Sequence, residues 1–188
     1  IDVVKTGIGY PAFFNDSAYI PWFQNIGYSL ERARDYGISG CVGGQLQNGE
    51  NFQSHAAAGG VLNFSKCLEL ALYQGIDKNT GKKLGADTPD LSKAENIEDV
   101  FNAYLGQVEY VAHKLAEIDN IRCAIFQEYF PHPFCSVLVN GCIENGKDSV
   151  GWGIDGSARM LFTGMTNVAN SFAAIKKLVF DDKTITMA

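Results

Sequence analysis

The sequence lacks any concentration of basic residues. Its 15 Lys and Arg are scattered along 188 residues and are outnumbered by 21 Asp and Glu, which gives a formal net charge of −6. Nucleic acids and anionic membrane surfaces are bound through clustered positive charge, so neither is an expected partner. Apolar runs long enough to span a membrane and a signal peptide are also absent, and the sequence therefore predicts a cytoplasmic location.

Regular metal-ligand and disulfide spacings are missing as well. The five cysteines are odd in number, no two of them have CxxC spacing, and the three histidines lie far apart in the sequence. Zinc sites and disulfide frameworks need such spacings, so the sequence predicts no metal and a reducing compartment. What the sequence does have is apolar material: 46% of its residues are hydrophobic, which is enough for the core of a globular domain.

Hydrophobic periodicity predicts a helix-rich chain. Apolar residues recur at helical spacing in the ranges 16–27, 29–36, 54–75, 96–118 and 166–180. The longest apolar stripe follows the predicted cap Asn96 and comprises Val100, Tyr104, Val108, Val111, Leu115 and Ile118. Composition and periodicity together indicate an α/β or mainly α enzyme-like domain.

Glycine, proline and polar residues predict the connections between these helices. The glycine density of 37–44 and of 151–160 disfavours both helix and strand, so each segment is expected to form a tight loop. The polar segment 77–93 is expected to be a surface loop, and 124–143 is expected to contain buried strands or short helices.

Three segments carry a resemblance to a known family. They are GYPAFFND at 9–16, ERARDYGISGCVGG at 31–44 and NVANSFAAIKKLVF at 167–180. Together they resemble the glycyl radical enzymes related to pyruvate formate-lyase, in which an E-x-A-R-D-Y helix precedes a G-C-V loop that bears the radical cysteine. The resemblance implies that Cys41 is this cysteine. It also implies that the chain forms a helix-rich part of the family's ten-stranded α/β barrel.

The resemblance further implies how the chain relates to a whole enzyme. No R-V-x-G-Y-like glycine loop occurs, so residues 1–188 are expected to be an interior fragment of the catalytic domain, without the glycyl radical domain and inactive alone. In the family the glycyl radical is installed by a radical-SAM activating enzyme, and no bound cofactor is expected. Small accessory subunits and a homodimer are compatible with the resemblance.

The chemistry of Cys41 has three interpretations. Most free cysteines are small buried hydrophobes, and a nucleophile would need a lowered pKa with a base nearby. A hydrogen-atom carrier needs a neutral thiol in a dry site, where flanking glycines allow close approach. The resemblance favours the third interpretation for Cys41 and leaves the other four, Cys67, Cys123, Cys135 and Cys142, as buried hydrophobes.

The residue two positions after the cysteine separates branches of the family. Diol and choline-type lyases and arylacetate decarboxylases resemble C-x-E enzymes, whose glutamate can donate or accept a proton. This chain has Gly43 at that position and no carboxylate before Glu50, and Val42 excludes the Cys-Cys pair of pyruvate formate-lyase itself. The branch that remains, the alkylsuccinate and benzylsuccinate synthases, adds a hydrocarbon radical to fumarate without an acid or a base. The sequence therefore predicts a fumarate-adding lyase of anaerobic hydrocarbon degradation.

The same resemblance places a substrate pocket. Gly40 and Val42 flank the cysteine, and pocket positions of this branch fall on Leu161, Met165 and Val168 at the start of the last predicted helix. Aliphatic side chains at these positions suit an alkane better than a toluene-type ring. The predicted substrates are accordingly an alkane and fumarate.

One position departs from this branch. An arginine that holds a fumarate carboxylate is expected about fifteen residues after the cysteine, where this chain reads QSHAAAGG. His55 is the cationic candidate there for holding a substrate carboxylate. Two alternatives therefore stay open: a decarboxylase or other lyase that acts on a carboxylate through His55, and a non-catalytic structural relative.

Overall fold

The computed structural model describes residues 1–8, 11–39, 43–46, 60–150 and 160–187. They divide into two compact units. The first comprises Ile1–Ser54 with Pro131–Asp155, and the second comprises His55–Phe130 with Gly156–Ala188. Each unit has a cluster of buried apolar side chains of its own. None of the described helices is both long enough and apolar enough to cross a membrane.

The first unit contains short helices and one antiparallel hairpin. Its elements are α1 (Asp2–Lys5), α2 (Asp16–Asn25), α3 (Leu30–Arg34), β1 (Tyr36–Ser39), β2 (Gly43–Leu46), α6 (Pro133–Ser136) and α7 (Cys142–Asn145). Phe23 of α2, Ala33 of α3 and Leu46 of β2 form the buried cluster. The two helices and the hairpin therefore share one small core, to which each contributes a buried residue.

Capping side chains set the ends of α2 and α3. The side-chain oxygen of Asn15 accepts a hydrogen bond from the Ser17 backbone N–H and starts α2, and Gly27, with a φ of 105°, follows its end. The helix predicted at 16–27 is confirmed. Ser29 caps α3, and its side-chain oxygen accepts a hydrogen bond from the Arg32 backbone N–H.

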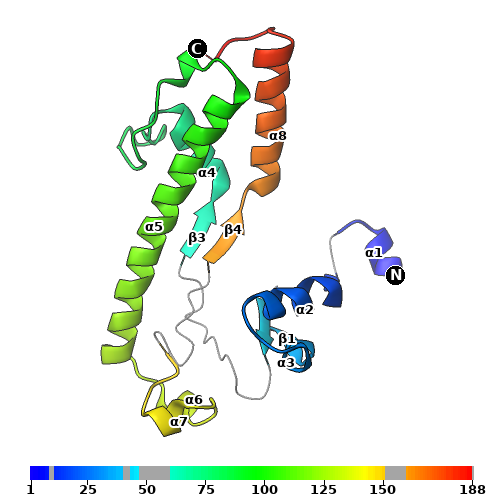
Figure 1. The fold of residues 1–188 in the computed structure, drawn as a ribbon, viewed down its shortest axis with the longest axis vertical. Coiled ribbons are helices and arrows are strands. Elements are labelled where there is room, and N and C mark those ends of the chain that lie inside the picture. The colour runs from blue at the N-terminus through cyan, green and yellow to red at the C-terminus, as the bar shows by residue number, and fades with distance from the viewer. Residues whose placement is uncertain (9–10, 40–42, 47–59, 151–159, 188) are drawn as a thin grey trace. The chain divides into compact units, whose positions relative to one another are not determined.

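The second unit is built on a pair of parallel strands, each followed directly by a helix. Its elements are β3 (Gly60–Asn63), α4 (Phe64–Leu72), η1 (Leu91–Lys93), α5 (Ile97–Tyr129), β4 (Met160–Thr163), α8 (Met165–Ile175) and η2 (Lys176–Asp181). Strands β3 and β4 lie side by side, and α4 and α8 continue from them (Figure 1). Helices α8 and η2 together confirm the helix predicted at 166–180, with the last turns in π-type hydrogen bonding.

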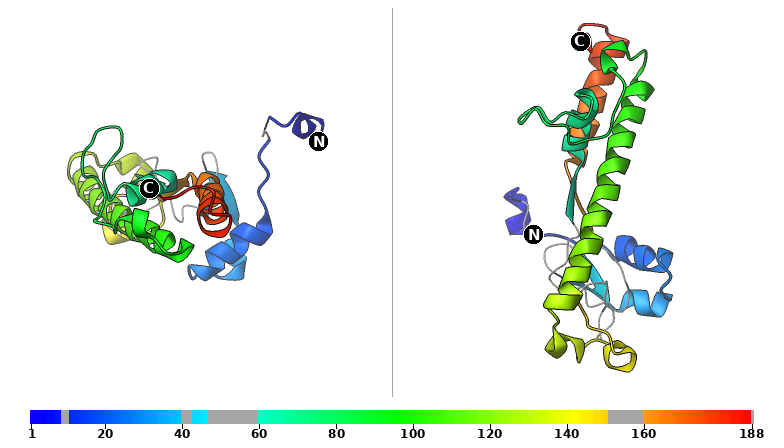
Figure 2. Two further views of the ribbon diagram at one scale, coloured as in Figure 1. Left: turned by 90° about the horizontal axis from the view of Figure 1, so that it is seen from above. Right: turned by 90° about the vertical axis from the view of Figure 1, so that its left-hand side faces the viewer.

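Helix α5 contributes the longest apolar face of this unit. Asn96 caps it as predicted, in a capping box with Asp99. Figure 2 shows it as one continuous helix. Val100 and Tyr104 of the predicted stripe are buried in the core, whereas Ile118 is 58% exposed. Val108, Val111 and Leu115 are half-buried and pack against this core, so the stripe is confirmed as far as Leu115.

Three sequence predictions differ from the structure where tertiary contacts outweigh local periodicity. The helix predicted at 54–75 begins at Phe64, because 60–63 pairs with β4 as a strand and Asn63 caps the helix. In the range 37–44, predicted to be a loop, 37–39 and 43–44 instead belong to the paired strands β1 and β2, and 40–42 lie outside the described residues. The strands or short helices predicted at 124–143 begin only with α6, since α5 continues to Tyr129.

The loop between α4 and α5 is fixed to α5 by the buried amide of Gln107. This side chain is fully buried: its Oε1 accepts a hydrogen bond from Ala86 N at 3.0 Å, and its Nε2 donates one to Ala86 O at 2.7 Å. Gly75 and Gly85 permit this approach, because a Cβ on Gly85 would collide with Gln107 Oε1 and a Cβ on Gly75 with the Ala86 carbonyl. The predicted surface loop thus has a fixed inner edge.

Replacing Gln107 with leucine is expected to loosen this loop without unfolding α5. The substitution Gln107→Leu leaves both backbone groups of Ala86 without their partner, which corresponds to roughly ten- to a hundredfold faster local opening. Hydrogen exchange of peptides covering 84–90, read by mass spectrometry, measures this directly. Asn102→Leu, on the exposed face of the same helix, is the matched control. Equal exchange in the two variants would contradict the assignment.

Candidate functional site

The hairpin β1–β2 is the element that carries the predicted radical cysteine. Its antiparallel register pairs Ser39 with Gly43, so a connection of three residues joins the strands. These residues are Gly40, Cys41 and Val42, the predicted reactive cysteine and its two neighbours, and they lie outside the described residues. The structure therefore describes the two strands that precede and follow the cysteine.

Helix α2 holds this hairpin through aromatic rings. The Tyr19 ring stacks on the Tyr36 ring, with centroids 5.2 Å apart. It also lies against Gly44, where an added Cβ would be 2.7 Å from Tyr19 Cδ1 and 3.0 Å from Trp22 Cζ3. The Tyr36 hydroxyl donates a hydrogen bond to Asp16 Oδ1 at 2.7 Å, and this bond raises the pKa of Tyr36. The hairpin is thus attached to α2 both along its backbone and at its base.

The two faces of the hairpin have different surroundings. Side chains alternate between the faces of a strand. Gly44 and Leu46 are buried on the face that meets α2, whereas Gly43 and Gln45 are half-buried on the other face. Position 43, which carries a glutamate in the C-x-E enzymes, therefore faces away from α2, and here it has no side chain.

The described residues among those predicted to line a pocket differ in exposure. Leu161 lies in β4 rather than at the start of α8, and its side chain is 47% exposed. Met165 is the first residue of α8 and is 65% exposed, whereas Val168 is buried in the core of the second unit. His55 lies outside the described residues. A substrate-binding role for these four residues stays a prediction.

The described cysteines behave as apolar side chains. Cys67, Cys123 and Cys142 are buried and Cys135 is half-buried, and all four are free thiols. Burial raises the pKa of Cys67 to about 11, which keeps its thiol neutral at pH 7. The described part of the chain holds no group of three His, Cys, Asp or Glu side chains that could bind a metal ion.

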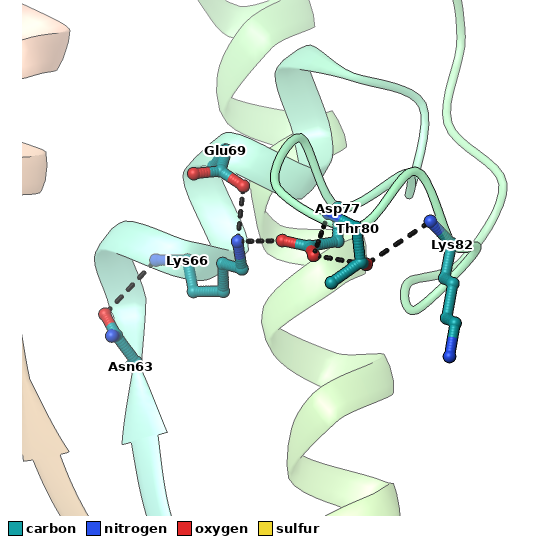
Figure 3. A network of polar contacts seen from close by, with 6 residues as sticks. All are labelled: Asn63, Lys66, Glu69, Asp77, Thr80 and Lys82. Carbon is teal, nitrogen blue, oxygen red and sulfur yellow. Dashed lines mark hydrogen bonds and ion pairs between the residues drawn. The ribbon is translucent and has the colours of Figure 1, made fainter.

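A polar network near the start of α4 is structural rather than catalytic. The Lys66 ammonium contacts Asp77 and lies 2.5 Å from Glu69 Oε1, while the Thr80 hydroxyl donates to Asp77 Oδ2 at 2.5 Å (Figure 3). Asn63 accepts from the Lys66 backbone N–H and caps the helix. The hydrogen bond from Lys66 is the main reason that the pKa of the buried Asp77 falls to about 2. Each charge in this network is paired, so it ties α4 to the loop that follows.

Comparison with known proteins decides the family. A family model described as pyruvate formate lyase-like matches residues 1–188. The chain belongs to this family of glycyl radical enzymes. The resemblance drawn from three sequence segments is thereby confirmed, and the chain is part of the family's α/β barrel.

The similar pyruvate formate lyase-like proteins break bonds in small polar molecules. The chain is 32% identical over 191 residues to an isethionate sulfite-lyase of Oleidesulfovibrio alaskensis, covering 99% of this chain and 23% of that protein. It is 32% identical over 193 residues to an indoleacetate decarboxylase of Tractidigestivibacter scatoligenes, covering 100% of this chain and 21% of that protein. The glycerol-bound structure of the B12-independent glycerol dehydratase from Clostridium butyricum matches with a TM-score of 0.84 and 32% identity, over 99% of this chain and 23% of that one.

The comparisons cover only part of each relative, which limits what the relatives' activities say about this chain. It spans less than a quarter of the length of the three proteins. The expected closeness to the alkylsuccinate and benzylsuccinate synthases finds no support among the named relatives, which are lyases, dehydratases and decarboxylases. The comparisons therefore establish the family of the chain, and the reaction of the whole protein is a matter of proposal.

Sequence reasoning missed the residues that hold the hairpin. It identified the cysteine motif, which includes Tyr36, but gave no role to Tyr19 or Trp22, which lie in α2 before the motif. The signal that could have found them is the density of aromatic residues in 10–36 beside the glycine pair at 43–44. A glycine pair next to rings predicts ring-on-backbone packing.

The contact between Gly44 and α2 predicts a cost for any side chain at this position. Gly44→Ala is expected to lower the free energy of unfolding by about 1–3 kcal/mol, because the Tyr19 and Trp22 rings must move to admit a methyl group. Urea denaturation measures the change. Gly106→Ala, at a helical position with open space around it, is the glycine control and is expected to be neutral or stabilising. A Gly44→Ala loss that is no smaller in a Tyr19→Leu background would contradict this explanation.

The paired state of Asp77 predicts a pH-dependent contribution to stability. Because its pKa falls from 3.8 to about 2 on folding, the carboxylate stabilises the folded state fully above pH 4, and the effect is lost as the pH falls toward 2. Asp77→Asn is therefore expected to be less stable than the unmodified protein at pH 7, with a gap that narrows below pH 4. Urea midpoints between pH 7 and 3 measure the gap. Asp87→Asn, whose carboxylate in the same loop is exposed beside Lys83, is expected to show a much smaller one.

Proposed function

We propose that the chain supplies the hydrogen-transfer cysteine of a glycyl radical lyase that acts on a small carboxylate substrate. The observation that supports this most directly is the hairpin: in a member of the pyruvate formate lyase-like family, its register leaves three residues between the paired strands, and Cys41 is the middle one. The aromatic rings of α2 fix both strands. Fixed strands on both sides of the cysteine support this role, because radical transfer over short distances depends on close positioning.

The proposed reaction moves one hydrogen atom and no charge at the cysteine. The Cys41 thiyl radical takes a hydrogen atom from a substrate C–H bond, giving a thiol and a substrate radical. A bond next to the radical carbon then breaks, and the product radical takes the hydrogen atom back, which restores the thiyl. The radical is delivered from a glycyl radical that a radical-SAM enzyme installs in the complete protein. This cycle needs a neutral thiol rather than a lowered pKa.

Gly43 restricts how this lyase can handle protons. A glutamate at this position can donate or accept a proton for the leaving group, and here that carboxylate is missing from the hairpin. Any proton that the reaction needs must therefore come from elsewhere, and His55 is the proposed group, because an imidazole can both donate and accept a proton. A carboxylate substrate fits this arrangement, because a histidine can also hold its negative charge.

A second candidate, addition of an alkane radical to fumarate, is favoured by Gly43 alone. That reaction uses no acid or base, and Leu161, Met165 and Val168 would supply an aliphatic pocket. The names of the relatives favour the first candidate, since they describe lyases, a dehydratase and a decarboxylase. The two candidates give different products from different substrates and can be separated directly.

The complete gene product, activated without oxygen, tests both candidates in one assay. It is offered isethionate, glycerol, indoleacetate, or an n-alkane with fumarate, and products are identified by mass spectrometry. Turnover of a carboxylate, with release of CO2 in the case of indoleacetate, is the expected result, and an alkylsuccinate would instead establish the second candidate. Cys41→Ser is expected to lower turnover by roughly a thousandfold or more while the glycyl radical signal in electron paramagnetic resonance persists. Cys135→Ser is the matched control, and Cys41→Ser turnover equal to that of this control would refute the assignment.

A further inference from the structure

The apolar stripe of α5 continues beyond the part that packs against the core of the second unit. Up to Leu115 its members contact the buried cluster of this unit. The same spacing of three or four residues then continues through Ile118, Arg122, Ile125 and Tyr129. Residues at this spacing share one face of a helix. The two halves of α5 therefore present one continuous face, in which Arg122 takes a position of the apolar stripe.

The second half of this face is exposed in the part of the chain that the structure describes. The side chains of Ile118, Ile125 and Tyr129 are 58%, 44% and 65% exposed, and Ile121, which borders the face, is 62% exposed. Together they extend along about three turns of the helix. Large apolar side chains gathered in this way are typical of a contact with other protein rather than of a surface in water.

Arg122, in the middle of this exposed half, has a hydrogen-bond donor without an acceptor. Its Nε and Nη2 donate to Asp119 Oδ1 at 2.9 Å and 2.6 Å. Its Nη1 is buried and has no hydrogen-bond partner among the described residues. Buried donors in folded proteins are nearly always paired. The arrangement therefore indicates that an acceptor belongs beside Nη1.

Asp119 decides which acceptor fits. Its carboxylate is buried and already balances the charge of the Arg122 guanidinium. A second carboxylate would leave a negative charge without compensation in a poorly solvated place, which is costly. A main-chain carbonyl is neutral and can accept from Nη1. The face thus fits a polypeptide segment that presents apolar side chains and a free carbonyl, as the C-terminal end of a helix does.

We propose that the face formed by Ile118, Arg122, Ile125 and Tyr129 binds another segment of the same polypeptide, outside residues 1–188, and that Arg122 Nη1 donates to a main-chain carbonyl of that segment. Two observations favour this occupant over a second copy of the protein. The chain spans 23% of the isethionate sulfite-lyase of Oleidesulfovibrio alaskensis, so most of a protein of that length lies outside it. The face also continues the stripe that packs against the core of the second unit, so the same core can extend along it. The proposal goes beyond the proposed function and does not depend on Cys41.

Photocrosslinking in the complete gene product tests which segment lies on this face. A benzophenone amino acid replaces Ile121, and in the control variant it replaces Gln127, an exposed residue on the side of α5 opposite Ile118. The expected result is a crosslink from position 121 to a peptide outside 1–188, in a product with the mass of a single chain, and no such crosslink from position 127. A product with the mass of two chains, a crosslink to a peptide within 1–188, or the same result from both positions would overturn the proposal.

Arg122→Lys tests the hydrogen bond to the segment. Lysine can still pair with Asp119, but it lacks the planar fork that places a second nitrogen at Nη1. Hydrogen exchange of the crosslinked segment, read by mass spectrometry, is expected to become about tenfold faster, because a hydrogen bond from a charged group is lost. Lys114→Arg, which changes an exposed cation paired with Glu117 on the same helix, is the control and is expected to leave this exchange unchanged.

Two results would refute the role of Arg122. The first is unchanged exchange of the segment in Arg122→Lys. The second is an equal rise in peptides that cover 97–110, which would mean that the substitution loosens α5 as a whole rather than one contact. Failure of the proposed function would be seen separately, as undiminished turnover in Cys41→Ser.

Discussion

The approach of the Tyr19 ring to the backbone of Gly44 is the contact on which the arrangement of the candidate site depends. With Cβ absent at position 44, the ring of a helix residue reaches the strand itself, and the same ring stacks on Tyr36 of the partner strand. A two-stranded hairpin is marginal by itself in water. The contacts with α2 therefore stabilise the geometry of the two described strands.

Close approach of a side chain to a glycine backbone also occurs in the second unit, where it joins a loop to a helix. Gly75 and Gly85 allow the loop backbone to approach so closely that the buried Gln107 amide can pair with both the N–H and the C=O of Ala86. Gly164 similarly admits Ser65 at the turn between β4 and α8, where its φ of 84° also suits glycine. At Gly44, Gly85 and Gly164, the missing Cβ thus lets an aromatic or polar side chain approach the backbone of another segment.

The sequence predicted those features that depend on neighbours along the chain. Asn96 and Ser29 could be recognised as caps, and Val100 and Tyr104 as part of a buried stripe, because helical spacing and capping chemistry are local. Strand β3 could not be recognised, because 60–63 becomes a strand through pairing with β4, about a hundred residues later in the sequence. The cysteine motif was identified by resemblance, whereas its support by α2 depends on ring packing that no spacing encodes.

The neighbouring glycines at 43 and 44 lie on opposite faces of the hairpin, because the side-chain direction alternates along a strand. Gly44 faces α2, where a side chain would displace the Tyr19 ring, so its smallness serves packing. Gly43 lies on the other face together with the half-buried Gln45. The packing of α2 therefore accounts for the glycine at position 44, and the missing carboxylate at position 43 is a separate feature of the sequence.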